Sequence, residues 1–164
     1  AVAAVALVNG ALYLVLAAEA RALSDQADAK KYTEDLKKAK DAKTRVTALT
    51  ELGKLAAVNK TLVEDALPDM YKALEDKDAS VRAAAATALG RCDEPAEKVV
   101  PLLHKMLKDD KDESAKIGAA RGLANVGPNA KEALKDLRAL AADKKSPLGK
   151  AAGVAVKAIN VKKN

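Results

Sequence analysis

Apolar residues recur along this chain at the spacing of α-helices, with polar residues filling the positions between them. Residues 97–110 show this best, because their valines, leucines and methionine fall on one side of a helical wheel, opposite Pro101, His104 and the lysines. The pattern predicts helices over residues 30–41, 42–55, 61–76, 79–92, 97–110, 114–126, 130–143 and 147–159. The chain is therefore expected to consist of short helices joined by brief turns.

These helices repeat as pairs. The first helices of successive pairs are residues 42–55, 79–92, 114–126 and 147–159, related by offsets of 37, 34 and 33 residues. Leu52, Leu89 and Leu123 occupy the same position in the first three. A single pair of this length cannot bury its apolar face, whereas stacked pairs bury it against one another. The repeat predicts an all-α solenoid of about four short helix pairs.

The first helices carry small side chains, most clearly in the stretch VRAAAATAL at residues 81–89. The whole chain has no Trp, no Phe and three Tyr, so its core must be built from thin elements placed close together. We expect the alanines to let neighbouring first helices approach closely while Leu52, Leu89 and Leu123 fill the gaps between them.

An acidic residue precedes a basic residue by four positions near the start of three first helices. The pairs are Asp41 with Arg45, Asp78 with Arg82, and Asp112 with Lys116. Each aspartate is expected to cap its helix, and each basic side chain to pair with that aspartate or with the aspartate of a stacked neighbour. The sequence thus predicts a ladder of ion pairs that runs from unit to unit.

The stretch VRAAAATALGRC, followed by VVPLLHKMLKD, resembles a HEAT repeat, particularly the short bacterial kind related to phycobilisome-lyase repeats. The resemblance covers about residues 32–159. It implies a right-handed α-α superhelix whose second helices line a concave face, and protein binding or scaffolding as the most frequent function. Contact residues are then expected among the polar groups of the second helices, namely Tyr71, His104, Lys105, Lys135 and Arg138.

The charge distribution bears on the partner. Net charge is +6, and residues 114–164 contain 11 basic and 3 acidic side chains. Another protein is the expected partner. The basic region itself is expected to be a solvated terminal face, and an acidic protein surface or an anionic membrane surface that binds it is the alternative. Nucleic acid is a weaker alternative, because no aromatic residue lies in the basic region to stack on bases. An enzyme related to bilin lyases is the other alternative that the resemblance leaves open.

The first 18 residues contain no charge and precede two Ala-x-Ala sequences, at Ala18–Ala20 and Ala20–Ala22. This arrangement is typical of the apolar core and cleavage region of an export signal. We therefore divide the chain into an apolar segment at 1–22 and a repeat domain at 23–164, and expect a periplasmic or secreted protein. A retained membrane anchor through residues 1–18 and a packed N-terminal helix are the alternatives.

The sequence offers little for catalysis. Cys92 is the only cysteine and His104 the only histidine, which excludes an internal disulfide and leaves too few ligands for a structural zinc site. No catalytic triad or phosphate-binding glycine loop can be assembled. Cys92 falls at an apolar position and is expected to be a buried, inert thiol. The chain is predicted to be non-catalytic and to need no cofactor.

Overall fold

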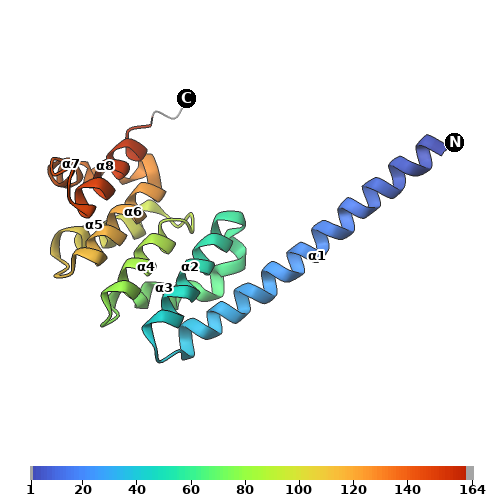
Figure 1. Cartoon of the computed structure of the whole chain (residues 1–164), viewed down its shortest axis with the longest axis horizontal. Coiled ribbons are helices and arrows are strands. Elements are labelled where there is room, and N and C mark those ends of the chain that lie inside the picture. Colours follow the sequence, from blue (N-terminus) through green and yellow to red (C-terminus); the bar gives the residue numbers. More distant parts are fainter. Residues whose placement is uncertain (1, 162–164) are drawn as a thin grey trace.

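The structure is a computed structural model that describes the backbone of residues 2–161 and the side chains of residues 13–161. Helices fill most of this range, and it contains no strand (Figure 1). The α-helices are α1 (Val2–Lys38), α2 (Ala42–Val58), α3 (Leu67–Lys72), α4 (Ala79–Leu89), α5 (Ala96–Asp109), α6 (Glu113–Val126), α7 (Leu134–Ala141) and α8 (Pro147–Ile159). Short 3-10 helices cover Lys60–Ala66, Ala73–Glu75 and Gly127–Ala133.

The first helices α2, α4, α6 and α8 pack side by side in chain order (Figure 1). The second helices lie between them in sequence, and comprise residues 60–75, α5 and residues 127–141. The predicted all-α solenoid is confirmed. Within the described residues it contains three complete helix pairs, and the fourth unit contributes its first helix, α8, alone.

The alanine-rich helix α4 is narrow because its side chains are small, and two neighbouring helices therefore approach it closely. A Cβ placed on Gly118 of α6 would lie 2.5 Å from the carbonyl oxygen of Ala83 in α4, and one placed on Gly122 would meet the carbonyl oxygen of Ala86. On the other side of α4, Ala88 packs against Gly53 of α2. Larger side chains at these positions would force the helices apart.

The three repeated leucines fill the core between the layers. Leu52, Leu89 and Leu123 are each no more than 1% exposed, as the repeat alignment predicts. Val156, which takes the leucine position in α8, is half-buried, in keeping with its place in the last described layer. Burial of one such leucine stabilises the fold by roughly 1.5–3 kcal/mol.

Two second helices differ from the uninterrupted helices that the periodicity predicts. Their first parts, Lys60–Ala66 and Gly127–Ala133, are 3-10 helix. In the later segment Gly127 adopts a positive φ of 69°, which ends α6, and Pro128 follows with no N–H to donate. Pro101 lies inside α5, on the exposed side that the helical wheel predicts.

The last part of α1 packs against the repeats. Ala29, Thr33 and Leu36 are buried there, and Thr33 donates a hydrogen bond to the carbonyl oxygen of Ala29 at 2.7 Å. The separate leading helix predicted at 30–41 is therefore wrong, because these residues continue a 37-residue helix that ends at Lys38. Its last part, from Ala29 on, covers the open side of α2.

The first part of α1 projects away from the repeats (Figure 1). All side chains from residue 13 to residue 24 are exposed. The helix continues without a break across residue 22, where the sequence predicts a domain boundary. Among the described residues, no helix combines the length and apolarity needed to span a bilayer. The side chains of residues 1–12 lie outside the described part, so export through this segment stays a prediction.

Candidate interaction surface

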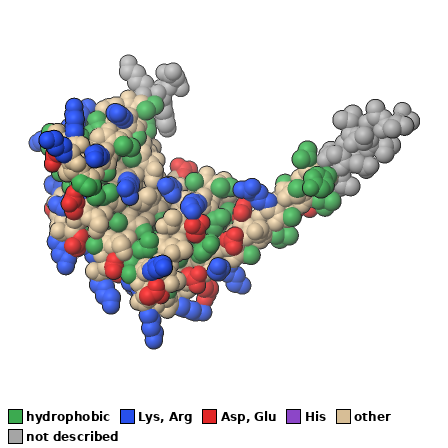
Figure 2. All heavy atoms as spheres, viewed as in Figure 1, with side chains coloured by type: hydrophobic (Ala, Val, Ile, Leu, Met, Phe, Trp, Pro, Cys, Tyr) green, Lys and Arg blue, Asp and Glu red, His purple; other side chains and the backbone are tan. Residues whose placement is uncertain are grey.

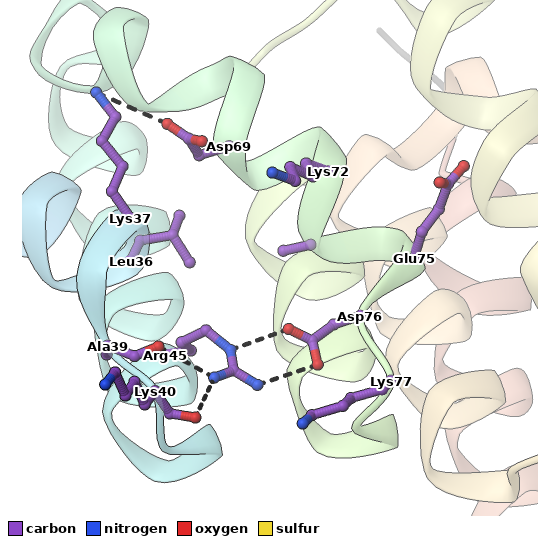
Figure 3. Close-up of a pocket in the computed structure, with 11 residues that line it drawn as sticks. Leu36, Lys37, Ala39, Lys40, Arg45, Asp69, Lys72, Glu75, Asp76 and Lys77 are labelled. Atoms are coloured by element: carbon purple, nitrogen blue, oxygen red, sulfur yellow. Dashed lines mark hydrogen bonds and ion pairs between the residues drawn. The ribbon is translucent and has the colours of Figure 1, made fainter.

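Arginine side chains at the start of α2 and α4 hold the first and second units together. The Nε and Nη2 atoms of Arg45 donate to the carboxylate of Asp76 at 2.9 and 3.1 Å, and Nη1 donates to the carbonyl oxygens of Ala39 and Lys40 (Figure 3). Asp76 also accepts a hydrogen bond from the backbone N–H of Asp78. Arg45 thus connects the start of α2 to the turn that follows the second helix of the same unit.

Arg82 repeats this arrangement one unit later and is more deeply buried. Its Nε and Nη2 atoms donate to the Asp110 carboxylate at 2.8 and 2.7 Å, and Nη2 also reaches Asp112 at 2.8 Å. The Arg82 and Asp110 side chains are each 9% exposed. Hydrogen bonds from Arg82 hold the pKa of Asp110 below its ordinary value. The guanidinium therefore joins its own unit to the first residue before α6.

The observed pairing differs in part from the predicted ladder. Asp41 and Asp78 cap their helices, accepting from the N–H groups of Thr44 and Ser80 at 2.8 Å. Asp112 makes no capping bond, because its carboxylate is used by Arg82. The principal acceptors, Asp76 and Asp110, lie two residues before the aspartates that the spacing singled out.

The ladder does not extend to the third unit. Lys116 Nζ donates to the carbonyl oxygen of Lys108 at 3.1 Å and forms no ion pair with any described residue. Asp143, which aligns with Asp110 at an offset of 33, instead accepts from the N–H groups of Lys145 and Ser146. Lysine lacks the planar fork with which an arginine holds a carboxylate and two carbonyls together.

Tyr71, predicted as a contact residue, joins the first and second units. Its half-buried hydroxyl donates to the Glu94 carboxylate at 2.9 Å. Lys98 pairs with the same carboxylate at 2.8 Å and places its Nζ 4.3 Å from the centre of the Tyr71 ring. Burial, followed by the contact with Glu94, raises the pKa of Tyr71. The hydroxyl is thus used inside the fold, and only the ring is left to meet a partner.

His104 joins the second and third units. Its Nε2 lies 2.7 Å from Oδ2 of Asp136 in α7. Hydrogen bonding to His104, and then the charges of Lys108 and Lys135, lower the pKa of Asp136. His104, predicted as a contact residue for a partner, is therefore an inter-unit contact whose side chain is 20% exposed.

A groove runs between the second helices of the first and second units. It has a volume of about 640 Å³. The first unit contributes Tyr71, Lys72, Leu74 and Glu75, and the second contributes Leu102, Lys105, Met106, Asp109 and Asp110. Its lining combines apolar side chains with charged side chains of both signs. We call these nine residues the second-helix groove; of the predicted contact residues it contains Tyr71 and Lys105.

Comparison with known proteins identifies the repeats. A sequence model of the HEAT repeats matches residues 29–113 and, in a second alignment, residues 67–160. The chain belongs to the HEAT-repeat family. The HEAT repeats thus span α2 to α8 and the packed end of α1, and leave out the projecting part of that helix.

The HEAT-repeat fold is also found among solved structures. The crystal structure of an engineered protein is similar to this chain, with a TM-score of 0.58 and 25% sequence identity. The alignment covers 80% of this chain and 62% of that protein, so the HEAT repeats here span less than two thirds of its length. No curated protein sequence matches this HEAT-repeat chain.

The remaining predicted contact residues, Lys135 and Arg138, lie on α7 of the third HEAT repeat. Both side chains are exposed, and neither forms an ion pair with the described residues. They do not line the second-helix groove. The structure therefore divides the five predicted residues into two at the groove, one inter-unit histidine and two on the neighbouring second helix.

Sequence reasoning missed two residues that shape this surface. Glu94 lies in the turn before α5 and holds both Tyr71 and Lys98, although no periodicity marks it. Leu102 belongs to the apolar stripe of α5, which predicts burial, but its side chain is 42% exposed at the groove. The apolar stripe of α5 is therefore wider than the part of the helix that the core buries.

The lone cysteine is buried, and the described side chains offer no cluster of metal ligands. Cys92 is 2% exposed, and burial raises the pKa of its thiol to about 12, as expected for an inert cysteine. No group of three or more His, Cys, Asp or Glu side chains is placed to hold a metal ion among the described residues. HEAT-repeat solenoids are typically non-catalytic and commonly mediate protein–protein interactions.

Proposed function

We propose that this chain is a non-catalytic scaffold that binds another protein along its second helices, with the second-helix groove at the centre of the contact. The observation that carries this proposal is the exposed Leu102 in the lining of the groove. Leu102 is exposed in a helix whose other large apolar side chains, including Leu103 and Leu107, are buried. Apolar side chains rimmed by charge are the usual composition of a protein-binding site.

The rim chemistry favours a partner with mixed charge at the groove and acidic groups beyond it. Lys72 and Lys105 face the groove together with Glu75 and Asp109, so a peptide bound there needs both signs. Lys135 and Arg138 on the next second helix have no acidic partner among the described residues, and favour carboxylates in the protein that binds.

Site-specific photo-crosslinking tests the proposal. A photoreactive amino acid at position 102 is expected to crosslink one partner in extracts of the source cells. The matched control carries the same amino acid at Thr50, an exposed position on the first helix α2. Equal crosslinking from both positions, or none from position 102, would contradict the assignment of this surface.

A second variant tests the acidic-partner component. Reversal of Lys135 and Arg138 to Glu is expected to weaken capture of the crosslinked protein and to leave the fold unchanged, because both side chains are exposed. Capture at the wild-type level would remove α7 from the contact. Tight DNA binding with a steep salt dependence would instead favour the nucleic-acid alternative, and bound pigment in the purified protein would favour the lyase alternative.

A further inference from the structure

The projecting part of α1 exposes large apolar side chains where its described side chains begin. Tyr13, Leu14, Val15 and Leu16 are 73, 69, 53 and 55% exposed. Figure 2 shows hydrophobic side chains along the part of the helix that projects from the repeats. We call residues 13–18 the apolar end of α1. It is separate from the second-helix groove and lies outside the matched repeats.

The apolar character surrounds the helix instead of forming one stripe. Successive residues of an α-helix point about 100° apart, so the four consecutive residues 13–16 cover its whole circumference. A helix that is apolar on every side is typical of one surrounded by apolar material, whereas a helix that binds one neighbour keeps a polar face toward water. A second copy of α1 would cover one side and leave the others wet.

The polarity of α1 changes sharply along its axis. Residues 1–18 contain no charge, and Glu19, Arg21, Asp25 and Asp28 follow before the helix meets the repeats at Ala29. The intervening residues 19–28 span about 15 Å at 1.5 Å per residue. An apolar end, a charged middle and a packed base therefore follow one another along one helix.

We propose that the apolar end of α1 inserts into the hydrocarbon region of a phospholipid bilayer and attaches the repeats to a membrane surface. Lipid chains cover a helix on all sides, which matches the distribution of Tyr13, Leu14, Val15 and Leu16. The charged residues from Glu19 onward stay in the headgroup and water layers. The repeats are then held about 15 Å from the surface, with their second helices open to a soluble partner.

Vesicle flotation of the full chain tests this attachment. The wild-type protein is expected to float with vesicles of pure phosphatidylcholine, and to do so equally at 0.1 and 0.5 M NaCl, because apolar insertion is not screened by salt. The double substitution Leu14→Glu and Leu16→Glu is expected to reduce partitioning on the order of 100-fold or more. The control Val154→Glu alters an exposed valine on α8, which is 62% exposed, and is expected to float like wild type.

Three results would overturn the proposal. The first is binding that requires anionic lipid and disappears at 0.5 M NaCl, because the basic residues 114–164 would then be responsible. The second is a soluble oligomer without affinity for vesicles, whose assembly Leu14→Glu and Leu16→Glu abolish, because a second copy would then cover the helix. The third is an intact mass of the native protein that shows the removal of residues 1–22. None of these results bears on partner binding at Leu102, so this inference and the proposed function can fail separately.

Discussion

The close contact between α4 and α6 predicts different effects for the same substitution at two helical glycines. Gly118 faces the backbone of Ala83, where a Cβ would lie 2.5 Å from the carbonyl oxygen and 2.8 Å from the carbonyl carbon. Gly153 in α8 has no atom within 4 Å of the corresponding Cβ position. The changes Gly118→Ala and Gly153→Ala therefore add the same methyl group, one into a helix contact and one into open space.

The magnitudes follow from two opposing terms. Replacing glycine by alanine inside a helix stabilises it by about 1 kcal/mol, and this gain is common to both variants. At position 118 the methyl group meets backbone, which cannot rotate away, so the helices must separate at a cost of about 1–3 kcal/mol. Gly153→Ala is thus expected to raise the free energy of unfolding by about 1 kcal/mol. The free energy of unfolding of Gly118→Ala is expected to lie about 1–3 kcal/mol below that of Gly153→Ala.

Urea denaturation followed by far-UV circular dichroism measures this difference, since the chain has no Trp for fluorescence. A difference of 1–3 kcal/mol corresponds to melting temperatures roughly 2–12 °C apart for a chain of this size. Gly122→Ala, which would meet the carbonyl oxygen of Ala86, is expected to behave like Gly118→Ala. Equal stabilisation by the substitutions at 118 and 153 would refute the close approach of the two backbones.

Other substitutions probe the core and the ion pairs. Leu89→Ala is expected to destabilise the fold by about 2–5 kcal/mol in urea titrations, against less than about 0.5 kcal/mol for the exposed Val154→Ala; a loss at Leu89 below 1 kcal/mol would remove it from the core. Arg82→Ala is expected to lower the free energy of unfolding by about 3–5 kcal/mol because it leaves Asp110 buried and unpaired. The stability of Arg82→Lys is expected to lie between those of Arg82→Ala and the wild type; equal stabilities of the three proteins would contradict this. Because the pKa of Asp110 is lowered in the folded state, the unfolded chain takes up its proton first as pH falls below about 4. The free energy of unfolding should therefore decline as the pH falls below about 4. If the decline is as steep in Asp110→Asn as in the wild type, Asp110 is not its cause.

The sequence is sufficient to predict the repeat and its layers. Periodicity aligns Leu52, Leu89 and Leu123 because all three face the same kind of interface, and a core position tolerates few residue types. The alanine run in α4 predicts close helix packing for the same reason. These features recur at a fixed offset because the same kind of helix contact recurs in each unit, and the same contact favours the same residue type.

Contacts that depend on turn geometry are harder to predict. Arg45 and Arg82 pair with Asp76 and Asp110 because the chain bends after each second helix and brings these carboxylates to the guanidinium. The aspartates that precede them by four residues cap their helices instead. Glu94 binds Tyr71 from a turn with no periodic signature. The exposure of Leu102 depends on how far one layer overlaps the next, which its position in the helical stripe does not specify.

The claim on which the whole description depends is that each helix pair is held by its neighbours. Circular dichroism of a peptide covering residues 78–110, which contains α4 and α5 alone, tests it directly, since these helices have 11 and 14 residues and are marginal in isolation. We predict a largely disordered spectrum without a cooperative melting transition, whereas the full chain gives a helical spectrum and a cooperative transition. A helical peptide that melts cooperatively would contradict the account.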